Sequence, residues 1–384
     1  MNLFSNNKIL GIIGGGQLGK MLLNNTYKWN ITTHVLDPNK DAPAKQFCNK
    51  FYCGNLNDFD TVYQFGKRVD IITFEIEHIN TEALIKLENE GIIIYPKPQT
   101  LRIIQDKFKQ KKFYFNNNIP TSNFVFFNRK RDIIDALEKN KIKLPFVWKS
   151  TKFGYDGFGV KIINGKTDFE LIENKPCIIE ELIDYKKELS IIISRNLDGE
   201  CKLFPTVEMK LNKISNQLET VIFPADIDEK INNQAKEIAS KVADSFKSVG
   251  LLAVEMFLTE DNQILVNEVA PRPHNSGHFT IEGTFTCQFE QHLRGILNLP
   301  LGNTKLISPG LMINLSGSED FSGNVHYENL DKIFKLEGVN LHIYGKKKIR
   351  PNRKMGHITI LNNNKSKAEE IKNNIKQTIK IISK

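Results

Sequence analysis

The stretch LLAVEMFLTEDNQILVNEVA, residues 251–270, decides the fold of the central part of this 384-residue chain. Two apolar runs flank a polar segment, which predicts an antiparallel hairpin closed at Asp261 and Asn262. Counting outward from that turn places Glu255 directly opposite Glu268. Opposed residues lie about 5 Å apart at Cβ, where like charges destabilise a sheet unless something compensates them. Mg²⁺ would compensate them, because it prefers oxygen ligands and is usually held by one or two carboxylates together with phosphates. The alternative is that the two glutamates are solvated on an exposed face of the sheet.

Polar side chains crowd the residues after the second strand of this hairpin. Arg272, His274 and His278 lie within PRPHNSGH, residues 271–278. The two prolines favour a loop over the helix that a histidine metal pair would need, so we expect no catalytic zinc there. The guanidinium of Arg272 is a planar, permanently charged fork suited to a carboxylate, bicarbonate or phosphate. The alternative is that Arg272 only pairs with Glu268.

The N-terminal segment has the pattern of a βαβ unit: a strand at 9–13, a turn GGGQLG at 14–19, a helix at 17–29 and a strand at 32–36 ending at Asp37. This pattern fits a dinucleotide fingerprint, although glycines before a helix accept any phosphate, and a tight turn alone is the third possibility. Apolar runs at 70–74 and 92–95 continue the alternation until PKP, residues 96–98. We therefore place the end of the first domain near residue 100.

The middle and C-terminal parts mix helices with antiparallel strands. We predict a helix at 100–117, a hairpin flap formed by PFVWKS and VKII around a glycine-rich loop at 149–160, and a helix at 233–249. The loop can fold its amides over phosphates with Lys149 adding charge, or it is a plain hairpin. From about residue 297, short strands, a basic turn at 344–354 and a helical tail predict a small third lobe.

Composition excludes several classes of protein. The net charge of +9 comes from scattered lysines without a basic helix or arm, so we expect no nucleic-acid partner. Five cysteines without a paired spacing suggest reduced thiols in a cytoplasm. The apolar runs are shorter than the roughly 18 residues of a membrane span, so we expect no membrane partner. The fold class is a multidomain combination of α/β and α+β.

These motifs together resemble the ATP-grasp superfamily and, within it, the 5-(carboxyamino)imidazole ribonucleotide synthase family. The resemblance spans nearly the whole chain and is carried, in the family's order, by GGGQLG, FEIEH (74–78), GYDG, AVEMF, NEVAPRPHNSGH, QFEQH (288–292) and NRKMGH (352–357). It implies a Rossmann-like domain at 1–100, an ATP-grasp domain at 101–296, a C-terminal β-rich lobe at 297–384 and a homodimer. It also implies ATP- and bicarbonate-dependent carboxylation of aminoimidazole ribonucleotide, through carboxyphosphate, in purine synthesis.

The resemblance assigns roles to individual residues. Nucleotide contacts are implied for Lys107, Lys149, Gly154, Tyr155, Asp156, Gly157, Phe158, Gly159, Val160, Glu180, Glu181, Leu182, Ile183, Glu188, Leu211, Asn267 and Glu268. Glu255 and Glu268 would hold Mg²⁺, and Glu188 the ribose hydroxyls. Contacts to aminoimidazole ribonucleotide, including its phosphate, are implied for Gln17, Leu18, Glu75, Tyr155, Lys346 and Arg353. The reaction centre would be formed by Asp156, Arg272, His274 and Asn275.

The sequence departs from the family pattern at two positions. Phe158 stands where the flap usually has Arg or Lys, and Leu211 where a His usually contacts the nucleotide. Three alternatives therefore stay open: another ATP-grasp ligase, such as the formate-dependent glycinamide ribonucleotide transformylase; a dinucleotide-dependent oxidoreductase, based on the first glycine motif; and a catalytically weakened nucleotide-binding relative.

Overall fold

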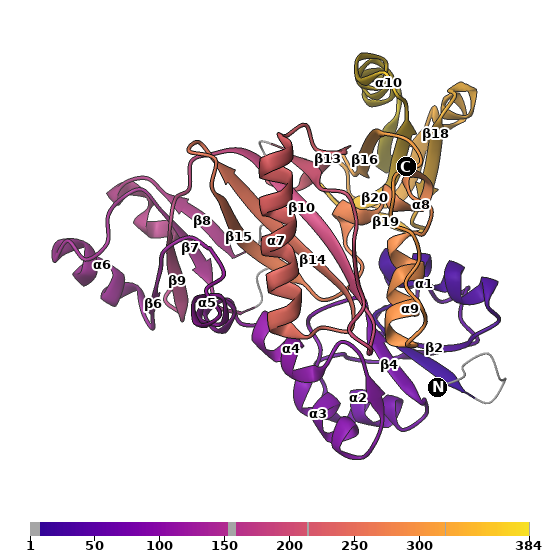
Figure 1. Cartoon of the computed structure of the whole chain (residues 1–384), viewed down its shortest axis with the longest axis horizontal. Helices are drawn as coiled ribbons and strands as arrows, with labels where there is room; N and C mark the ends of the chain where they lie inside the picture. Colours follow the sequence, from indigo (N-terminus) through magenta and orange to yellow (C-terminus); the bar gives the residue numbers. More distant parts are fainter. Residues whose placement is uncertain (1–7, 153–158, 213–214, 319, 384) are drawn as a thin grey trace.

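The computed structural model describes residues 8–152, 159–212, 215–318 and 320–383. Figure 1 shows the N-terminal sheet at the bottom and a small sheet with helix α6 (Lys130–Glu138) at the left. A long sheet crossed by helix α7 (Glu229–Phe246) fills the middle, and the C-terminal strands lie at the upper right. The multidomain mixture of α/β and α+β units expected from the sequence is thus present.

The N-terminal unit is a parallel five-stranded sheet in the order β3-β2-β1-β4-β5. Its central strands are almost entirely apolar, as strands covered by helices on both faces require. The elements are β1 Ile9–Ile13, β2 Thr32–Asp37, β3 Lys50–Cys53, β4 Ile71–Phe74 and β5 Ile93–Ile94, with α1 Gln17–Lys28, α2 Phe59–Gly66 and α3 Thr81–Asn89. The predicted βαβ unit is confirmed.

The single helix predicted at 100–117 is wrong, because two helices occupy this segment. Helix α4 (Pro98–Ile104) ends before Asp106, whose side chain accepts hydrogen bonds from the backbone N–H groups of Phe108 and Lys109 at 3.1 and 3.2 Å. An aspartate that bonds to the backbone in this way starts a new helix instead of continuing the old one. Helix α5 (Lys107–Asn116) therefore begins with Lys107.

A four-stranded sheet in the order β6-β9-β7-β8 follows. Its strands are β6 Phe124–Phe127, β7 Phe146–Ser150, β8 Val160–Ile163 and β9 Cys177–Glu181. Strands β7 and β8 form the predicted antiparallel hairpin, in which Lys149 pairs with Val160. The residues at the tip of this flap, 153–158, lie outside the described part of the chain.

The long sheet has the order β15-β14-β10-β12-β13-β16-β20-β18, with β11 on the side of β10. Its strands are β10 Tyr185–Arg195, β11 Cys201–Leu203, β12 Val207–Leu211, β13 Leu218–Phe223, β14 Gly250–Thr259, β15 Ile264–Ala270, β16 Gly310–Ser316, β18 Val339–Ile343 and β20 Lys354–Leu361. Helix α7 begins a turn earlier than predicted and packs its buried face, including Ile238 and Val242, against one side of β10, β14 and β15.

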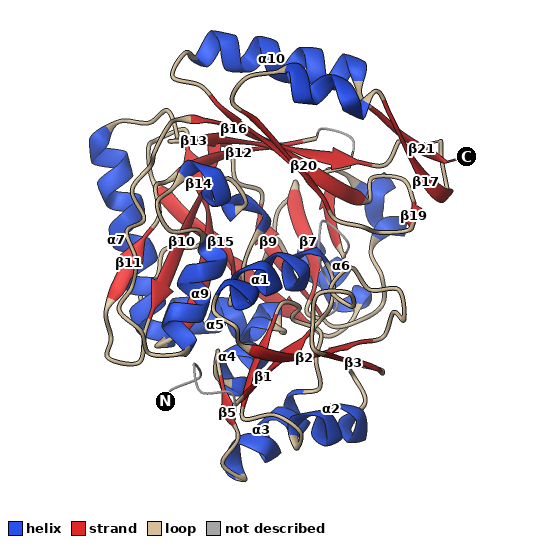
Figure 2. Ribbon diagram, turned by 90° about the vertical axis from the view of Figure 1, so that its right-hand side faces the viewer, coloured by secondary structure: helices blue, strands red, loops and turns tan. Residues whose placement is uncertain are grey.

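The C-terminal strands continue this sheet through the pairing of β13 with β16. Helix α10 (Lys365–Thr378) packs on β16 and β20, across the top of the view in Figure 2. A separate small sheet contains β17 (Gly323–Glu328), β19 (Lys348–Ile349) and β21 (Lys380–Ser383). The central and C-terminal parts therefore share one sheet, and the domain boundaries near 100 and 296 stay predictions.

Helix α9 (Gln288–Ile296) joins the N-terminal sheet to the long sheet. Its buried His292 lies 2.7 Å from the hydroxyl of Thr73 on β4 and accepts a 3.2 Å hydrogen bond from the backbone N–H of Leu251 on β14. Gly250 has φ +94°, and a Cβ there would lie 2.9 Å from this imidazole. His292 thus fixes the N-terminal sheet against β14, which pairs with β15; these two strands carry Glu255 and Glu268.

Candidate active site

The predicted opposition of Glu255 and Glu268 is present in the β14–β15 hairpin. The register nearer the turn differs by one residue from the predicted count, because Met256 pairs with Val266. A β-bulge at Asn267 restores the predicted pairing. The physical reason is the core beneath α7: Met256 and Val266 lie in it, and continued alternation would place Glu268 on the same apolar face. The bulge turns Glu268 to the opposite face, beside Glu255.

A third carboxylate, Glu188 on β10, lies on this face two residues from Ser190, the pairing partner of Glu255. Burial, followed by the charges of Glu268 and Glu188, raises the pKa of Glu255 well above its usual value. Burial likewise raises the pKa of Glu188. Lys107 has the opposite effect on Glu268, whose pKa it lowers to about 2 through a 2.7 Å ion pair. The face therefore carries three carboxylates, on which Lys107 acts through an ion pair with Glu268 and Lys354 through its charge on Glu255.

Lysines and one buried glutamate form the neighbouring end of the site. Nζ of Lys111 and Nζ of Lys149 each lie 3.1 Å from Oε2 of Glu180, and Ser122 donates a 2.7 Å hydrogen bond to the same oxygen. Lys149 also donates to the side-chain oxygen of Asn267 at 3.1 Å. This last contact connects the lysines to the bulge beside Glu268.

The two lysines of this group share a single carboxylate, that of Glu180. Burial would raise the pKa of Glu180, but Lys149 and Lys111 outweigh it and lower the pKa to about 2. Burial lowers the pKa of Lys111 to about 8 despite the attraction of Glu180. Oε1 of Glu180 is buried and has no hydrogen-bond partner among the described residues. It is an acceptor left for a ligand donor.

The loop after β15 brings three of the predicted reaction-centre residues to the same end of the strand. Nε2 of His274 lies 3.3 Å from Oε1 of Glu255. The amide of Asn275 exchanges two hydrogen bonds, of 3.0 and 2.7 Å, with Asn314 on β16. Each side chain is therefore oriented by a strand of the long sheet. Asp156, the fourth predicted member, lies outside the described residues.

Arg272 does not pair with Glu268, so that alternative is wrong. Its Nη2 lies 3.0 Å from Oε1 of Glu77, which follows β4 of the N-terminal sheet, and its Nη1 donates to the carbonyl of Pro273 at 3.1 Å. Nε of Arg272 is buried and has no hydrogen-bond partner in the described part of the chain. The guanidinium therefore keeps a buried donor for an anion that enters between the two sheets.

The first glycine loop holds two carboxylates in the structure. The N–H of Gly15 donates to Asp37 and that of Gly16 to Glu75, both at 2.7 Å. Burial raises the pKa of Glu75 to about 7, although the Gly16 N–H favours its charged form. Gln17 and Leu18 begin α1 directly after these amides. Two of the amides that could cradle a phosphate are thus engaged by acidic side chains.

The basic turn between β18 and β20 contacts this N-terminal unit. Lys20 of α1 donates a 2.8 Å hydrogen bond to the carbonyl of Ile343. Lys346 donates to the carbonyl of Lys354 at 2.7 Å, and Arg353 donates to that of Lys348 at 2.6 Å. The strand end before this turn thus contacts α1, the helix that follows the glycine loop, whereas the bonds of Lys346 and Arg353 lie within the turn. Their role toward the ribonucleotide stays a prediction.

The remaining predicted nucleotide residues are spread over the flap and the sheet edge. Gly159 precedes β8, Val160 starts it, Glu181 ends β9, and Leu182 and Ile183 follow β9. Leu211 ends β12 and packs against the apolar cluster around Phe223. Outside the described residues lie Gly154, Tyr155, Asp156, Gly157 and Phe158. All of these assignments stay predictions.

Sequence reasoning did not single out Glu77, Lys111 or Lys354. Glu77 lies in FEIEH, where only Glu75 was selected, and Lys111 lies one helical turn after Lys107 on α5. Lys354 is close enough to lower the pKa of Glu255. The i, i+4 spacing of the two lysines places both on one helix face, which could have revealed Lys111.

The carboxylates fit a cation only in part. Among the described residues, no group of three or more His, Cys, Asp or Glu side chains could hold a metal ion. Glu255 and Glu268 can still supply two ligands, because Mg²⁺ commonly takes one or two carboxylates and completes its shell with phosphate oxygens and water. The raised pKa of Glu255 supports a positively charged ligand at this position.

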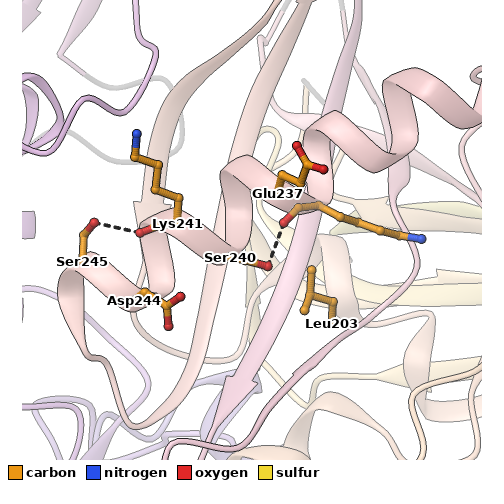
Figure 3. Close-up of a pocket in the computed structure, with 7 residues that line it drawn as sticks. Leu203, Glu237, Ser240, Lys241, Asp244 and Ser245 are labelled. Carbon is orange, nitrogen blue, oxygen red and sulfur yellow. Dashed lines mark hydrogen bonds between the residues drawn. The ribbon is translucent and has the colours of Figure 1, made fainter.

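An open groove beside α7 takes no part in this arrangement (Figure 3). It is lined by Leu203, Lys236, Glu237, Ser240, Lys241, Asp244 and Ser245. The hydroxyls of Ser240 and Ser245 donate to carbonyls of α7 itself, at 2.8 and 2.7 Å. Helix α7 covers the face of the sheet opposite to Glu255 and Glu268. The groove is therefore separated from the site by the sheet.

Known families and structures match the chain along most of its length. The ribonucleotide synthetase preATP-grasp domain matches residues 7–105, the ATP-grasp domain residues 112–289, and the phosphoribosylaminoimidazole carboxylase C-terminal domain residues 310–371. The N5-carboxyaminoimidazole ribonucleotide synthase of Bacillus subtilis (strain 168) is 39% identical over 358 residues, which are 92% of this chain and 91% of the relative.

The chain belongs to the N5-carboxyaminoimidazole ribonucleotide synthase family. The crystal structure of the synthetase from Thermotoga maritima superposes with a TM-score of 0.89 at 41% identity, covering 98% of this chain and all (100%) of that one. The synthase from Aspergillus clavatus in complex with ADP and 5-aminoimidazole ribonucleotide superposes with a TM-score of 0.85 at 32% identity, covering 95% and 96%. The chain spans about two thirds of the longer carboxylases that it also matches. The resemblance inferred from the sequence is confirmed.

Membership of this family makes the chain an ATP-grasp ligase with a preATP-grasp unit before its catalytic sheet. No helix among the described residues is both long and apolar enough to cross a membrane.

Proposed function

We propose that the chain carboxylates 5-aminoimidazole ribonucleotide to N5-carboxyaminoimidazole ribonucleotide in purine biosynthesis, using ATP and bicarbonate. The observation that carries this proposal is the junction at the end of β15. There Glu255 and Glu268, the lysine–glutamate group and the loop with Arg272 and His274 lie within contact of one another. Phosphoryl transfer to bicarbonate needs nucleotide and acceptor to be held side by side in this way.

Lys107 and Lys149 are proposed to face the phosphates of ATP. Both are held by carboxylates, at 2.7 and 3.1 Å, so their ammonium groups are oriented before the nucleotide binds. A fixed positive charge stabilises a transferring phosphoryl group without reorganisation during the reaction. Oε1 of Glu180, which is buried without a partner among the described residues, would accept a hydrogen bond from the exocyclic amine of adenine.

Glu255 and Glu268 would hold Mg²⁺ together with the nucleotide phosphates. When bound, this ion would neutralise the charge that develops on the phosphoryl oxygens. The raised pKa of Glu255 and the three carboxylates on this face support the assignment. Glu188, which lies on the same face, would accept hydrogen bonds from the ribose hydroxyls.

Arg272 would bind bicarbonate and then its phosphorylated form. A bicarbonate oxygen attacks the γ-phosphorus of ATP, the bond from phosphorus to the bridging oxygen breaks, and carboxyphosphate and ADP result. The buried Nε and the Nη groups of Arg272 offer donors to the carboxylate end of this intermediate. His274 and Asn275 line the same loop and would orient the acceptor.

The second step joins carbon to the exocyclic amine of the ribonucleotide. A C–N bond forms, the bond from the carboxyl carbon to the phosphate oxygen breaks, phosphate leaves, and one amine proton is lost. Asp156 is the proposed acceptor of that proton, since a carboxylate is available near neutral pH. Glu75, which accepts a hydrogen bond from Gly16 of the first glycine loop, would hold the ribonucleotide together with Lys346 and Arg353 of the basic turn.

The alternatives open from the sequence differ in what they predict. A dinucleotide-dependent oxidoreductase loses its main support, since Asp37 accepts from the backbone N–H groups of Gly15 and Asn39 instead of offering both oxygens to a ribose. A formate-dependent transformylase would turn over with formate in place of bicarbonate. A weakened relative, suggested by Phe158 and Leu211, would bind ATP without turnover.

The test is ADP formation by the purified protein with bicarbonate and 5-aminoimidazole ribonucleotide, beside the Arg272→Ala variant. The wild type should form ADP only when both are present. Loss of a positioned charge in the transition state should lower turnover by about 10²–10³-fold. Equilibrium binding of ATP should stay within about twofold, because the lysines that face the phosphates are unchanged.

Glu77→Gln is the matched control, because it breaks the same ion pair but keeps the guanidinium. It should lower turnover far less than Arg272→Ala. Equal losses in the two variants, with ATP binding and melting temperature falling together, would show that Arg272 is only a structural partner. Turnover with formate alone would favour the transformylase.

We also propose a homodimer in the cytoplasm, as the family resemblance and the unpaired cysteines suggest. Light scattering after size-exclusion chromatography should give about twice the 44.0 kDa of one chain. A mass equal to one chain at micromolar concentration would remove the dimer from this proposal.

A further inference from the structure

Two glutamines of helix α9 each hold the backbone of one distant residue. Oε1 of Gln288 accepts a hydrogen bond from the N–H of His274, and its Nε2 donates to the carbonyl of the same residue, both at 2.8 Å. Gln291 makes the corresponding pair of bonds to Gly302, at 2.8 and 2.9 Å. Both glutamines are fully buried. They differ in what they hold, since His274 belongs to the loop after β15 that carries the predicted reaction-centre residues, and Gly302 belongs to the connection after α9.

Within the described part of the chain, the side chain of Gln288 makes one bond more than that of Gln291. Its Nε2 lies 3.1 Å from Nδ1 of His278. The backbone N–H and carbonyl of His274 fix which end of the Gln288 amide is oxygen and which is nitrogen. The second amide hydrogen therefore points to His278, and Nδ1 of that imidazole must be the acceptor. This arrangement implies a neutral His278 with its proton on Nε2, a buried nitrogen that has no hydrogen-bond partner among the described residues.

The imidazole of His278 is itself held by aromatic side chains behind the loop. Its ring centroid lies 4.8 Å from that of His357 on β20 and 6.0 Å from that of Phe289. His357 in turn accepts or donates a 3.1 Å hydrogen bond with the hydroxyl of Tyr344 and stacks on His342 at 4.4 Å. The second amide hydrogen of Gln288 thus bonds to a group fixed by the C-terminal strands.

The space around Gln288 admits little variation. A Cβ at Gly277 would lie 2.6 Å from Oε1 and 2.8 Å from Cδ of Gln288, so the loop backbone passes directly against the amide. Ser276, which lies between the two histidines, is fully buried and contacts Ser190 on β10 at 2.8 Å. The backbone from His274 to His278 is therefore held on both sides, by α9 and by the strand that carries Glu188.

We propose that Gln288 is a positioning residue for the carboxylation reaction, because its amide fixes the loop that carries Arg272, His274 and Asn275. The proposal rests on the proposed function of that loop. The amide saturates both backbone groups of His274 and requires the Nδ1-acceptor form of His278. Arg272 lies two residues before the clamped position, so a loosened clamp displaces the bicarbonate end of the site while the lysines of the nucleotide end stay in place.

Gln288→Leu and Gln291→Leu form a matched pair, since each removes an identical buried amide from the same helix. Both should lower the melting temperature by similar amounts. Gln288→Leu should lower kcat for bicarbonate-dependent ADP formation by about 10–100-fold, because a displacement of about 1 Å can cost 10²-fold in rate. It should leave the Kd for ATP within about twofold. Gln291→Leu should keep kcat within about twofold of the wild type.

A second pair of variants, at His278, keeps the proposal testable if Gln288→Leu does not fold. His278→Asn keeps an acceptor near the position of Nδ1, whereas His278→Leu removes it. His278→Asn should retain at least about fivefold more kcat than His278→Leu. Equal kcat in these two variants, or parallel losses of kcat in Gln288→Leu and Gln291→Leu, would show a structural role only and overturn the proposal.

Spectroscopy separates this proposal from the function itself. In protein labelled with ¹⁵N-histidine, the Nδ1 resonance of His278 should have the shift of an unprotonated nitrogen at pH 6, and Gln288→Leu should change it. A protonated Nδ1 in the wild type would overturn the proposal whatever the enzyme's activity. If wild-type protein forms no ADP with bicarbonate and ribonucleotide, the proposed function fails, and the resonance still decides whether Gln288 fixes the loop.

Discussion

Two adjacent groups of charged side chains differ in whether they contain charges of both signs or carboxylates alone. The lysine–glutamate cluster, Lys111, Lys149 and Glu180, contains both signs, and its ammonium groups lie 3.1 Å from one carboxylate oxygen. The carboxylate cluster consists of Glu188, Glu255 and Glu268, with Lys107 2.7 Å from Glu268 and His274 3.3 Å from Glu255. The first cluster has two lysines for one carboxylate. The second has three carboxylates close together, and a bound cation would lower the repulsion between them.

The largest expected effect is on the lysine–glutamate cluster. Glu180→Gln removes the one carboxylate between two buried lysines and leaves their charges uncompensated. Breaking a buried ion pair from one side costs about 3–5 kcal/mol, so the melting temperature should fall sharply. Glu181→Gln is the control, because Glu181 is exposed and bonds only to Asn123 at 2.9 Å among the described side chains. Thermal unfolding of both variants checks this; equal melting temperatures would show that Glu180 does not compensate the two lysines.

The corresponding Glu→Gln substitution in the carboxylate cluster should raise the melting temperature instead of lowering it. Without Mg²⁺, Glu255→Gln removes a partly buried charge that Glu268 and Glu188 repel, so the melting temperature at pH 8 should rise, on the order of 2 °C for each kcal/mol gained. With Mg²⁺ and ADP present, the wild type should gain more stability than the variant. Glu208→Gln is the control on the same sheet, because Glu208 has a lysine partner, Lys187, at 2.7 Å. A fall in melting temperature for Glu255→Gln in EDTA would contradict the claim that repulsion between the carboxylates destabilises the metal-free protein.

The melting temperature of the metal-free protein should also depend on pH, through the raised pKa of Glu255, and this effect is smaller. The pKa of Glu255 is raised by burial above its ordinary value of 4.5, so the folded state holds that proton more tightly than the unfolded state. The contribution of Glu255 to stability is therefore present at low pH and is lost as the pH rises from 4.5 through the raised pKa. Melting temperatures measured in EDTA between pH 5 and 8 should fall less steeply for Glu255→Gln. Identical slopes would contradict the raised pKa.

The smallest expected effect is that of Ser122→Ala. Ser122 donates a 2.7 Å hydrogen bond to Glu180 and accepts one of 2.9 Å from Lys111, and Glu180 keeps both lysines when the hydroxyl is lost. The free energy of unfolding should fall by about 1.5–3 kcal/mol, the range for a hydrogen bond to a charged group. Denaturant titration measures it. A loss as large as that of Glu180→Gln would mean that the hydroxyl, and not the pair of lysines, balances the carboxylate.

The opposition of Glu255 and Glu268 was predicted from the sequence more accurately than the pairing register of the hairpin that carries them. Counting from Asp261 and Asn262 gave the correct opposition of Glu255 and Glu268, although the turn is one residue out of the predicted register and a bulge at Asn267 compensates. Two consecutive polar residues, Asn267 and Glu268, interrupt the alternation of this strand and are the local sign of that bulge. The parallel N-terminal sheet was equally predictable, because its strands are short apolar runs between turns.

Contacts between distant segments were not predictable from local pattern. Arg272 pairs with Glu77, almost 200 residues earlier, because α9 fixes the N-terminal sheet against the long sheet through His292. Lys111 reaches Glu180 only because Asp106 interrupts the expected helix and redirects α5. Neither pairing has a periodicity or spacing that a single sequence displays, since both depend on how separate sheets pack.

The central claim is that the carboxylate cluster binds the divalent cation of the nucleotide. Mn²⁺ in place of Mg²⁺ can be counted by electron paramagnetic resonance in the presence of ADP. We predict that the wild type and Glu208→Gln bind Mn²⁺ with equal affinity, whereas Glu255→Gln and Glu268→Gln each weaken that binding by at least about tenfold, the equivalent of 1.4 kcal/mol. Unchanged Mn²⁺ affinity in both of these variants would contradict the claim.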